Sequence, residues 1–600
     1  MAWRYNRPVF DREDPFIVVS FENSLIFKTG NQRTERPVFV NKVAPCRQAC
    51  PIGIDIPAAF HAASKGDIDG GLRITLRENP LPGVCGRVCY HPCEAECNRK
   101  KFDEPINIRS LERFLSDHGR VNLTADVPIH SKKNKIAVVG SGPAGLSAAY
   151  HLARRGYPVT LFEARPELGG MLRYGIPPYR LPTEVLDRDI RRVLSLGIEA
   201  QPGMKIGKDL EWSALDSFDA VFLGFGLQSG RSLPAAKDSK KMFLTGLEFL
   251  SDPQKWGRGE KTENVLIIGG GNVAIDVART LLRIRRGRGE KITLVCPETR
   301  DQMLALPEEI EEALEEGITI LNGWAPHTFD RKGKRRLSVD FFKTRVTKDE
   351  ISGALKIVRS GKENQALHAD NVIVAIGQAR EPFPLPRGIE IKEGRLVTDP
   401  FGRTLPPKVF AGGDVAGGRA FVADAIASGK RGAFAIACAL EGKDVDLEFR
   451  EHQIGNSPAI SFHDVMKPSE KNFVDLKKVV SFEELNTLFF PKSPRRHPKK
   501  LAPGNRKKIF DEVTRGLTPS MMEVETSRCF KCGTCIDCEY CMDFCPDLSV
   551  LRNEKSGVYG FDQDYCKGCG VCYVACPRHV IEMVGEMAGE MVVEASGDTK

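Results

Sequence analysis

Long apolar runs are absent from this 600-residue chain, and their absence excludes a membrane-spanning protein. No stretch approaches the length of about 18 apolar residues that a helix needs to cross a bilayer. The opening residues, 1–14, carry arginines and acids where a signal peptide requires an apolar centre. We therefore expect a soluble, cytoplasmic protein with no membrane partner.

The basic stretches lack aromatic residues, which argues against a nucleic-acid partner. The formal net charge is +8, and the excess is concentrated in residues 283–291 and 492–508. Neither stretch contains Phe, Trp or Tyr, the side chains that stack on bases. Such runs are usually solvated faces or linkers, although they can also attract an acidic partner protein.

The chain contains 18 cysteines, but they are nearly absent outside two short regions. Six lie within residues 46–97, ten lie within residues 529–576, and only Cys296 and Cys438 lie elsewhere. A disulfide scaffold is usually small and needs an oxidising compartment, so these tight groups indicate metal sites. Neither isolated cysteine belongs to a CxxC motif, which disfavours a redox-active dithiol in the middle of the chain.

The first glycine-rich turn, GSGPAG at residues 140–145, follows a strand at 135–139 and opens a helix at 144–155. In such a turn the first glycine permits a tight bend, the second lets a pyrophosphate approach the backbone, and the third lets helix and strand pack closely. The next strand, 157–163, ends in Glu163, at the position where an acid accepts hydrogen bonds from ribose hydroxyls. This complete context predicts a dinucleotide site.

A second βαβ unit has a strand at 265–268, a helix at 273–286 and a strand at 291–296. Its turn, GGGNVA at residues 269–274, carries alanine in place of the third glycine. Two dinucleotide sites in one chain predict a flavin held beside a nicotinamide.

A third glycine-rich turn, AGGDV at residues 411–415, follows a strand-like stretch at 372–376. As a pattern alone, GGD is a common turn. Beside the two other turns, however, it would close the first site and bring Asp414 near the ribityl chain of a flavin.

Four longer motifs follow one another along the chain: GGMLRYGIPPYRLP from Gly169, GGGNVAIDVAR from Gly269, VIVAIGQ from Val372 and VFAGGDV from Val409. They resemble the small (beta) subunit of bacterial glutamate synthase, a module that also occurs in dihydropyrimidine dehydrogenase. The resemblance covers about residues 46–442 and keeps the order of the motifs. It implies FAD in the first site, NAD(P)H in the second, and hydride transfer from nicotinamide to flavin.

The resemblance also bears on which nicotinamide is used. Family members that use NADPH carry basic residues after the second strand of the nicotinamide domain, whereas this chain has Pro297 and Glu298 there, and Leu304 replaces a third. A carboxylate would repel a 2′-phosphate and accept from a 2′-hydroxyl, so we predict NADH, with NADPH less favoured. Arg300 and the nearby basic run argue in the other direction.

Motifs and resemblance together define a set of candidate cofactor-binding residues; Met171, Arg180 and Ile206 enter it through the resemblance alone. The set is Gly140, Gly142, Pro143, Ala144, Gly145, Glu163, Gly170, Met171, Arg180, Ile206, Gly269, Gly271, Asn272, Val273, Glu298, Gly377, Gly413 and Asp414. No nucleophile–base pair stands out in the sequence, and we expect the chemistry to be carried by FAD and nicotinamide.

The carboxyl-terminal cysteines form two ferredoxin runs. The pattern CxxCxxCxxxCP begins at Cys566 and also at Cys535. Thiolates at this spacing hold three irons of a cubane, while the cysteine before proline normally reaches the other cluster, so the doubled run predicts two 4Fe-4S clusters rather than zinc. Cys529 and Cys532 extend the first run upstream and leave its register ambiguous, and we prefer the register that ends in CxxxCP. The predicted ligands are Cys535, Cys538, Cys541, Cys545, Cys566, Cys569, Cys572 and Cys576.

The amino-terminal cysteines resemble the iron-sulfur domain of the same family, which carries two clusters. No cysteine precedes Cys46, so the upstream CxxC pair of one cluster is missing, and Cys46 and Cys97 alone cannot hold a cubane. The resemblance implies that the other cluster survives and that its ligands are Cys50, Cys89, Cys93 and Glu112. We therefore expect three 4Fe-4S clusters in the chain. Cys46, Cys85 and Cys97 could be buried thiols or could replace an assigned ligand, and Glu112 could be an ordinary helix residue.

These features predict an iron-sulfur flavoprotein that passes electrons from NADH through FAD and 4Fe-4S clusters to a ferredoxin or a partner reductase such as a sulfite reductase, or in the reverse direction. The fusion is similar to NAD(P)H:ferredoxin oxidoreductases and to the DsrL-like oxidoreductases associated with dissimilatory sulfite reductase. An alternative is an obligate electron-input subunit of a glutamate synthase or another multi-subunit reductase, without independent turnover. A dimer or a larger complex is compatible with both.

With about 150 residues per domain, the length suggests about four domains. We expect an α/β fold with two Rossmann-like dinucleotide-binding domains, for FAD and NAD, preceded by a helical Fe-S domain and followed by a ferredoxin-like α+β domain. The expected segments are an N-terminal extension (1–40), the helical 4Fe-4S domain (41–130), the FAD domain (131–255 and 386–445), the NAD(P)H domain (256–385), a linker (446–520), the ferredoxin-type domain (521–585) and a tail (586–600).

Overall fold

The computed structural model describes residues 28, 30, 33–124, 131–233, 243–257, 263–285, 291–332, 336–348, 355–466, 474–553 and 559–586. Contacts divide the chain into two compact units, which we treat separately. We call residues 42–483 and 490–536 the large unit, and residues 1–41, 484–489 and 537–600 the small unit. Most of the predicted N-terminal extension and tail, and basic residues 286–290, lie outside the described residues.

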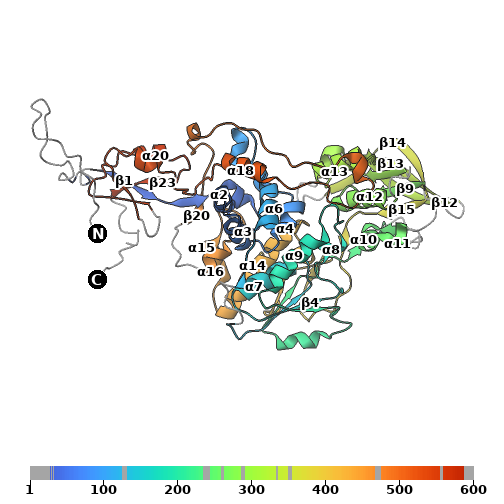
Figure 1. Ribbon diagram of the computed structural model, residues 1–600. Coiled ribbons are helices and arrows are strands. Elements are labelled where there is room, and N and C mark those ends of the chain that lie inside the picture. Colours follow the sequence, from blue (N-terminus) through green and yellow to red (C-terminus); the bar gives the residue numbers. More distant parts are fainter. Residues whose placement is uncertain are drawn as a thin grey trace, which may run out of the picture. The chain divides into compact units, whose positions relative to one another are not determined.

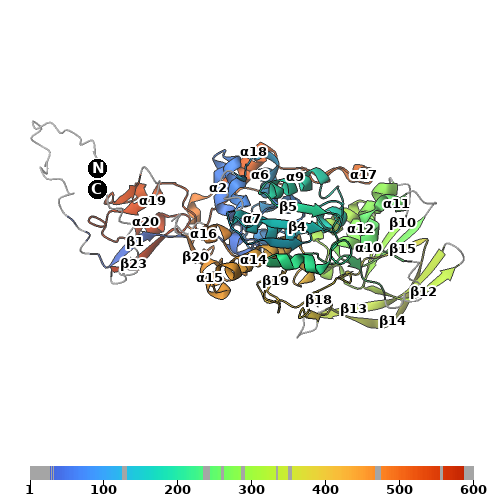
Figure 2. The same ribbon diagram turned by 90° about the horizontal axis from the view of Figure 1, so that it is seen from below.

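The large unit contains a parallel sheet that carries the first glycine-rich turn. Its elements are β3 (Ile136–Val139), α7 (Pro143–Arg154), β4 (Val159–Glu163), α8 (Met171–Tyr174), α9 (Thr183–Leu194), β5 (Glu199–Pro202), β6 (Ala220–Leu223), β19 (Val409–Ala411) and α14 (Val422–Glu441). The strand order is β19-β6-β3-β4-β5, with every pairing parallel. All residues of β3 are buried, as in a parallel strand that helices cover on both faces. Helices α7 and α14 pack together beside this sheet (Figures 1 and 2).

A second parallel sheet carries the second glycine-rich turn. Its elements are β8 (Phe243–Thr245), α10 (Gly246–Ser251), α11 (Pro253–Gly257), β9 (Asn264–Ile268), α12 (Asn272–Arg285), β10 (Lys291–Cys296), α13 (Pro307–Glu315), β11 (Thr319–Asn322) and β15 (Asn371–Val374). The order is β11-β10-β9-β15-β8, again all parallel. An antiparallel sheet of β12 (Trp324–Lys332), β13 (Arg336–Lys348) and β14 (Leu355–Ala369) packs on it through a shared apolar core. The expected pair of Rossmann-like domains is therefore confirmed.

Two short ribbons complete these domains, β7 (Ser229–Gly230) with β16 (Gln378–Ala379) and β17 (Ile391–Lys392) with β18 (Arg395–Leu396). The two helices expected after the glycine turns are close to the observed ones. Helix α7 begins at Pro143 and α12 begins at Asn272.

A helical domain precedes the first sheet, as expected. It comprises α1 (Pro45–Ala49), α2 (Ile56–Ser64), α3 (Ile68–Leu76), α4 (Pro82–Val88), α5 (Pro92–Ala95) and α6 (Ile108–His118). Helices α4 and α6 touch closely because Gly86 lacks a side chain: a Cβ there would lie 2.5 Å from the Cα of Arg113. Buried Lys430 of α14 ties this domain to the first sheet, donating to the carbonyl of Ile52 at 2.6 Å and forming an ion pair with Glu78.

The segment expected to be a linker contributes ordered elements to the large unit. They are α15 (Val445–His452), α16 (Phe462–Met466), β20 (Val474–Val479), which pairs with β2 (Asn41–Val43), α17 (Pro503–Arg506) and, beyond the segment, α18 (Pro519–Arg528). Glu512 shows how the segment is fixed: its carboxylate pairs with Arg87 at 2.8 Å and with Arg113 at 2.9 Å. Proline and lysine content suggested a connector, but it says nothing about such long-range ion pairs.

The small unit has the expected mixture of short helices and antiparallel strands. Its described elements are β1 (Glu35–Phe39), α19 (Tyr540–Asp543), β21 (Val550–Arg552), β22 (Tyr559–Phe561), α20 (Val571–Ala575) and β23 (Ile581–Gly585). Strand β1 pairs with β23, so residues assigned to an extension supply a strand of this unit, while residues 521–536 belong to the large unit. Among the described residues, no helix is both long and apolar enough to cross a membrane.

Candidate dinucleotide and iron-sulfur sites

The first glycine-rich turn has the geometry that its three glycines predict. Gly140 has φ +100°, and a Cβ at Gly145 would lie 1.8 Å from the carbonyl oxygen of Gly140. A Cβ at Gly142, in contrast, would have only one neighbour within 4 Å, at 3.9 Å. The turn therefore needs glycine for the bend and for helix packing, and it leaves space above Gly142, where a pyrophosphate would approach. These residues fit a bound dinucleotide.

Glu163 lies beside this turn at the end of β4. Its Oε2 accepts from the Ser141 backbone N–H at 2.9 Å and from the Ser141 hydroxyl at 2.6 Å, and its Oε1 accepts from the Arg165 N–H at 2.9 Å. A carboxylate offers about four acceptor positions, so one remains for a ribose hydroxyl. The Ser141 contacts fix the carboxylate against the turn.

Two further glycine turns pack against the first. A Cβ at Gly170 would lie 2.8 Å from the Cα of Gly142, and one at Gly413 would lie 2.9 Å from the Cβ of Ala144. The structure thus brings the GGM and GGD turns to the dinucleotide turn. Asp414, next to Gly413, is partly buried, and burial raises its pKa.

The residues suggested by the resemblance alone have differing surroundings. Met171 begins α8 directly after Gly170. Ile206 is buried in the apolar core of the first sheet. The guanidinium of Arg180 is paired with Asp276 of α12 at 2.6 Å and with Glu309 of α13 at 2.9 Å, so it links the two dinucleotide domains.

The second turn repeats the geometry of the first. Gly269 has φ +143°, and a Cβ there would lie 2.2 Å from the carbonyl oxygen of Ala375. At Gly271 a Cβ would meet nothing within 4 Å, while Ala274, in the third position, is fully buried. One close approach, one open position and a buried alanine in the third place fit a second dinucleotide.

Glu298 lies two residues beyond β10 and faces this turn, because a Cβ at Gly270 would lie 2.8 Å from its Oε2. The side chain is only 9% exposed, and Oε2 is buried without a hydrogen-bond partner. An acceptor left unpaired in a buried position is costly unless a ligand donates to it. Burial, followed by the charge of Glu298, raises the pKa of the neighbouring Cys296 thiol to about 12, so this cysteine remains protonated.

The remaining candidates of the second site differ in exposure and contacts. The side-chain oxygen of Asn272 accepts from the Leu306 N–H at 2.9 Å and fixes the loop before α13. Val273 packs against the core of this domain, and Gly377 has φ +115° after β15. Leu304 is 63% exposed.

Five of the amino-terminal candidates line one cavity of about 460 Å³ in the large unit. They are Cys50, Cys85, Cys89, Cys93 and Glu112. The predicted ligand set is thus brought together, with Cys85 as an additional thiol. Asn79 donates to Glu112 Oε1 at 2.7 Å, and burial raises the pKa of Glu112 to about 8. A buried carboxylate of this kind gains from coordinating a cation.

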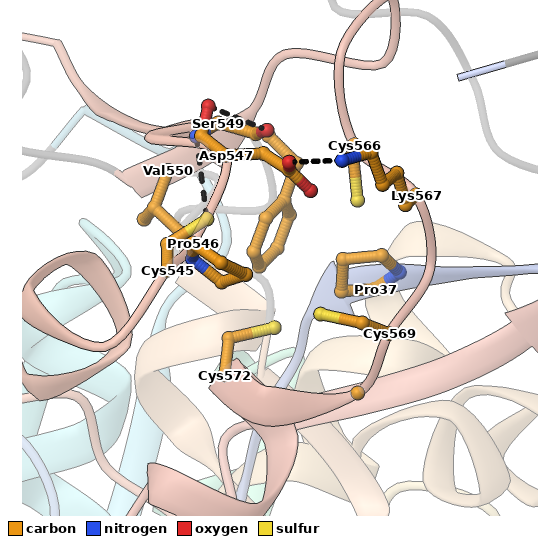
Figure 3. Close-up of a pocket in the computed structure, with 12 residues that line it drawn as sticks. Pro37, Cys545, Pro546, Asp547, Ser549, Val550, Cys566, Lys567, Cys569 and Cys572 are labelled. Carbon is orange, nitrogen blue, oxygen red and sulfur yellow. Dashed lines mark hydrogen bonds and ion pairs between the residues drawn. The ribbon is translucent and has the colours of Figure 1, made fainter. Parts of the chain in front are cut away.

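In the small unit, Cys545, Cys566, Cys569 and Cys572 line a cavity of about 310 Å³. Their sulfur atoms face a common space (Figure 3). This is the arrangement predicted for a ferredoxin cluster: three thiols of the second run with the fourth cysteine of the first run. The Ser549 N–H donates to Cys545 Sγ at 3.3 Å and orients it.

The other ferredoxin candidates are spread over two elements and a unit boundary. Cys541 lies in α19 and Cys576 ends α20, and these two helices are in contact. Cys538 precedes α19 in the small unit, whereas Cys535 belongs to the large unit.

A third cysteine-lined cavity, of about 350 Å³, was not expected. Its wall carries Cys46, Cys97, Cys529 and Cys532. Burial raises the pKa of Cys46 well above its usual value, and the nearby thiols of the other three raise it further. Within the described residues, no three His, Cys, Asp or Glu side chains have the close spacing that holds a single metal ion.

Sequence reasoning missed this grouping, although a signal was available. Cys46 and Cys97 were left without partners, and Cys529 and Cys532 were surplus to the ferredoxin run, with the CxxC spacing that the amino-terminal domain lacked. All eighteen cysteines lie in the described part of the chain as thiols.

Family comparison divides the chain in the same way. Residues 134–429 match the family of pyridine nucleotide-disulphide oxidoreductases, residues 28–123 match dihydropyrimidine dehydrogenase domain II with its 4Fe-4S cluster, and residues 559–582 match a 4Fe-4S binding domain. The structure of Mycobacterium tuberculosis FprA in complex with NADPH matches 56% of this chain and 91% of its own, with a TM-score of 0.44 and 17% identity.

Several curated relatives are similar over most of the chain. The beta subunit of NADP(+)-dependent formate dehydrogenase from Moorella thermoacetica is 33% identical over 82% of this chain and 70% of its own length. The beta subunit of NADPH-Fe(3+) oxidoreductase from Geobacter sulfurreducens is 37% identical over 63% of this chain, which spans only 57% of that relative. The PreT subunit of NAD-dependent dihydropyrimidine dehydrogenase from Escherichia coli O157:H7 is 34% identical over 66% of this chain and 92% of its own. With its two dinucleotide turns and its cysteine-lined cavities, the chain belongs to the pyridine nucleotide-disulphide oxidoreductase family and is an iron-sulfur flavoprotein of the NAD(P)H oxidoreductase type.

Proposed function

We propose that this chain oxidises NADH and delivers single electrons to a ferredoxin or to a partner redox enzyme, with flow in the reverse direction also supported by the same sites. Bound FAD would take up the hydride and release its two electrons one at a time. The observation that carries the proposal is the presence, in one compact unit, of two glycine turns with open second positions and a cavity lined by cysteines.

The residues proposed to hold each cofactor follow from the contacts. The first turn, with Glu163, would hold the FAD pyrophosphate and ribose, and the second turn, with Glu298, would hold those of NADH. Two ligand sets that line cavities would hold 4Fe-4S clusters: Cys50, Cys89, Cys93 and Glu112; and Cys545, Cys566, Cys569 and Cys572. A third set, Cys535, Cys538, Cys541 and Cys576, is proposed from the spacing in the sequence alone.

NADH is favoured over NADPH by the chemistry of Glu298. Its buried Oε2 has no donor, and the 2′-hydroxyl of NADH is a donor that would satisfy it. A 2′-phosphate would bring negative charge against a buried carboxylate, which is strongly unfavourable. The thiol ligands would be lost to oxidation in an oxidising compartment, which supports a cytoplasmic location.

A second candidate is an electron-input subunit with no turnover of its own. The relatives from Moorella, Geobacter and Escherichia are all named as subunits, which favours a partner protein. The chain would then pass its electrons only within an assembled complex.

Dye-linked oxidation of NADH and of NADPH by the isolated, fully loaded chain tests both candidates. The main proposal expects turnover with a one-electron dye and a higher kcat/KM for NADH. An FAD-loaded chain that is inert with both nucleotides would support the subunit alternative, and a higher kcat/KM for NADPH would contradict the role of Glu298.

A further inference from the structure

Four cysteines that belong to none of the proposed ligand sets meet at one cavity of the large unit. Cys46 lies in α1, and Cys97 lies between α5 and α6 in the helical domain. Cys529 ends α18, and Cys532 follows three residues later, far along the chain. The cavity, of about 350 Å³, is intermediate in volume between those lined by the other two cysteine sets, of about 310 and 460 Å³.

The loop that carries Cys529 and Cys532 is held in place by a buried polar network at the end of α18. Arg528 donates to Asp103 at 3.2 Å and to the carbonyl of Glu104 at 2.8 Å, while Arg99 donates to the carbonyl of Arg528 at 2.5 Å. Fully buried Glu525 accepts from the Asn107 N–H at 3.0 Å. Buried charges persist only when they are paired, so this network fixes the position of the loop against the helical domain.

The turn around Cys532 is fixed equally well. Gly533 has φ +69°, a Cβ there would lie 2.7 Å from the carbonyl oxygen of Lys42, and its own carbonyl accepts from the Lys42 N–H at 2.7 Å. The Asn98 amide donates to Cys532 Sγ at 3.5 Å and to the carbonyl of Val480 at 3.0 Å. A hydrogen bond to a ligand sulfur is the contact that orients cluster ligands and tunes their potential.

Apart from Asn98, Arg99 and Lys531, the rest of the lining is apolar. It includes Ile56, Phe60 and Ile106. Four cysteines in a largely apolar cavity provide the ligand chemistry of an iron-sulfur cluster, in which thiolates bind iron. A pair spaced as CxxC with two single cysteines is also the composition of one cluster set in the resembling family, where the pair lies upstream.

We propose that Cys46, Cys97, Cys529 and Cys532 bind a fourth 4Fe-4S cluster, with the CxxC loop after α18 in place of the missing upstream pair. Transfer of a cubane from a thiolate-ligated carrier would form four iron–thiolate bonds to this chain and break the four iron–thiolate bonds to the carrier. The four protons lost by the incoming thiols balance those taken up by the displaced thiolates, with no net oxidation or reduction.

The fourth cluster would extend the electron relay. Cys46 lies in α1 and Cys50 directly follows it, one turn later, with the Cys50 N–H donating to the Cys46 carbonyl at 3.2 Å. Cys93 and Cys97 have the same spacing, four positions apart in the sequence. Two short covalent segments would therefore join this cluster to the one at Cys50 and Cys93.

Iron and acid-labile sulfide analysis of the anaerobically purified full chain tests the proposal. We expect about sixteen irons and sixteen sulfides per chain, and about twelve of each in the double variant Cys529→Ser/Cys532→Ser. The matched control Cys438→Ser, which changes a buried cysteine away from the cavities, should keep the wild-type content. A wild-type content of about twelve irons that the double variant does not lower would overturn the proposal, as would zinc in place of iron with sulfide.

A second variant keeps the proposal testable if the double variant fails to fold. Asn98→Leu removes the hydrogen bond to Cys532 Sγ without removing a ligand, so iron content should stay unchanged while the midpoint potential of one cluster falls. An unchanged set of potentials would contradict the site. Only the role of the fourth cluster in electron relay rests on the proposed function. If NADH reduces FAD in a chain that contains about twelve irons, the proposed function stands and the fourth cluster alone is refuted.

Discussion

Glu298 is the residue that we propose to set the nicotinamide preference of the second site, because its buried carboxylate lies beside the second glycine turn. Its Oε2 lacks a donor and lies against Gly270. The acid is positioned by the strand end, whereas exposed Leu304 offers no charge to a phosphate.

We predict that Glu298→Arg lowers kcat/KM for NADH and raises it for NADPH, changing their ratio about tenfold or more, since a repulsive group is replaced by an attractive one. Steady-state kinetics with both nucleotides measure this ratio. Leu304→Arg, a control at the exposed position, should raise NADPH use without loss of NADH use. A ratio unaffected by Glu298→Arg would remove Glu298 from the site.

Glu112, which we propose as the fourth ligand in the amino-terminal cavity, can be distinguished from Cys85, which lines the same cavity. We predict that Glu112→Ala lowers the iron content by up to four per chain or alters the EPR spectrum of one cluster, whereas Cys85→Ala leaves both unchanged. Iron analysis and EPR of the reduced proteins compare the two variants. The reverse outcome would assign the ligand to Cys85.

His151 makes stability depend on pH. Burial, followed by the charges of Lys430 and Arg154, holds the pKa of this histidine well below its usual range. The unfolded chain binds a proton at this residue below about pH 6.5 and the folded chain does not, so stability is present above that pH and is lost as the pH falls, by about 1.4 kcal/mol per pH unit. Melting temperatures from pH 7 to 5 should fall less steeply for His151→Gln; equal slopes would contradict this account.

At the scale of elements, the glycine turns show why much of the site could be predicted. The first turn closes within six residues, since a Cβ at Gly145 would lie 1.8 Å from the carbonyl oxygen of Gly140, so a local pattern of apolar strand, glycines and helix carries nearly all of the information. The observed starts of α7 and α12 differ from the expected ones by a single residue each.

We predict that Gly271→Ala folds and retains FAD but raises the KM for NADH about tenfold or more, because its Cβ meets no protein atom and would occupy the space of the pyrophosphate. Gly269→Ala is the matched control: its Cβ would lie 2.2 Å from the Ala375 carbonyl oxygen, so it should fail to fold. Soluble yield, FAD content and KM separate these outcomes. A Gly271→Ala protein with an unchanged KM would argue against nucleotide binding at this turn.

Other elements could not be predicted, because their partners are distant in the sequence. Strand β1 pairs with β23, and the loop after α18 is fixed by Asp103 and Arg99 of the helical domain. The local sequence of neither segment predicts which distant segment it contacts. For the same reason, the sequence spacing places Cys529 and Cys532 in an extension of the ferredoxin run, whereas the structure brings them to one cavity with Cys46 and Cys97.

At the scale of the whole molecule, the chain combines hydride chemistry with a set of single-electron carriers. The large unit contains both dinucleotide turns and two cysteine-lined cavities, and the small unit contains a third. A long chain of carriers on one polypeptide suits the transfer of electrons to an acceptor outside it.

The most direct test of this account is an anaerobic titration of the fully loaded chain with NADH, with flavin absorbance and cluster EPR recorded on the same samples. We predict that NADH bleaches the flavin and that signals of reduced 4Fe-4S clusters then appear, with more electrons taken up per chain than FAD alone can hold. A flavin that NADH leaves oxidised, or a flavin that is bleached while dithionite-reducible clusters never receive an electron from it, would contradict the account.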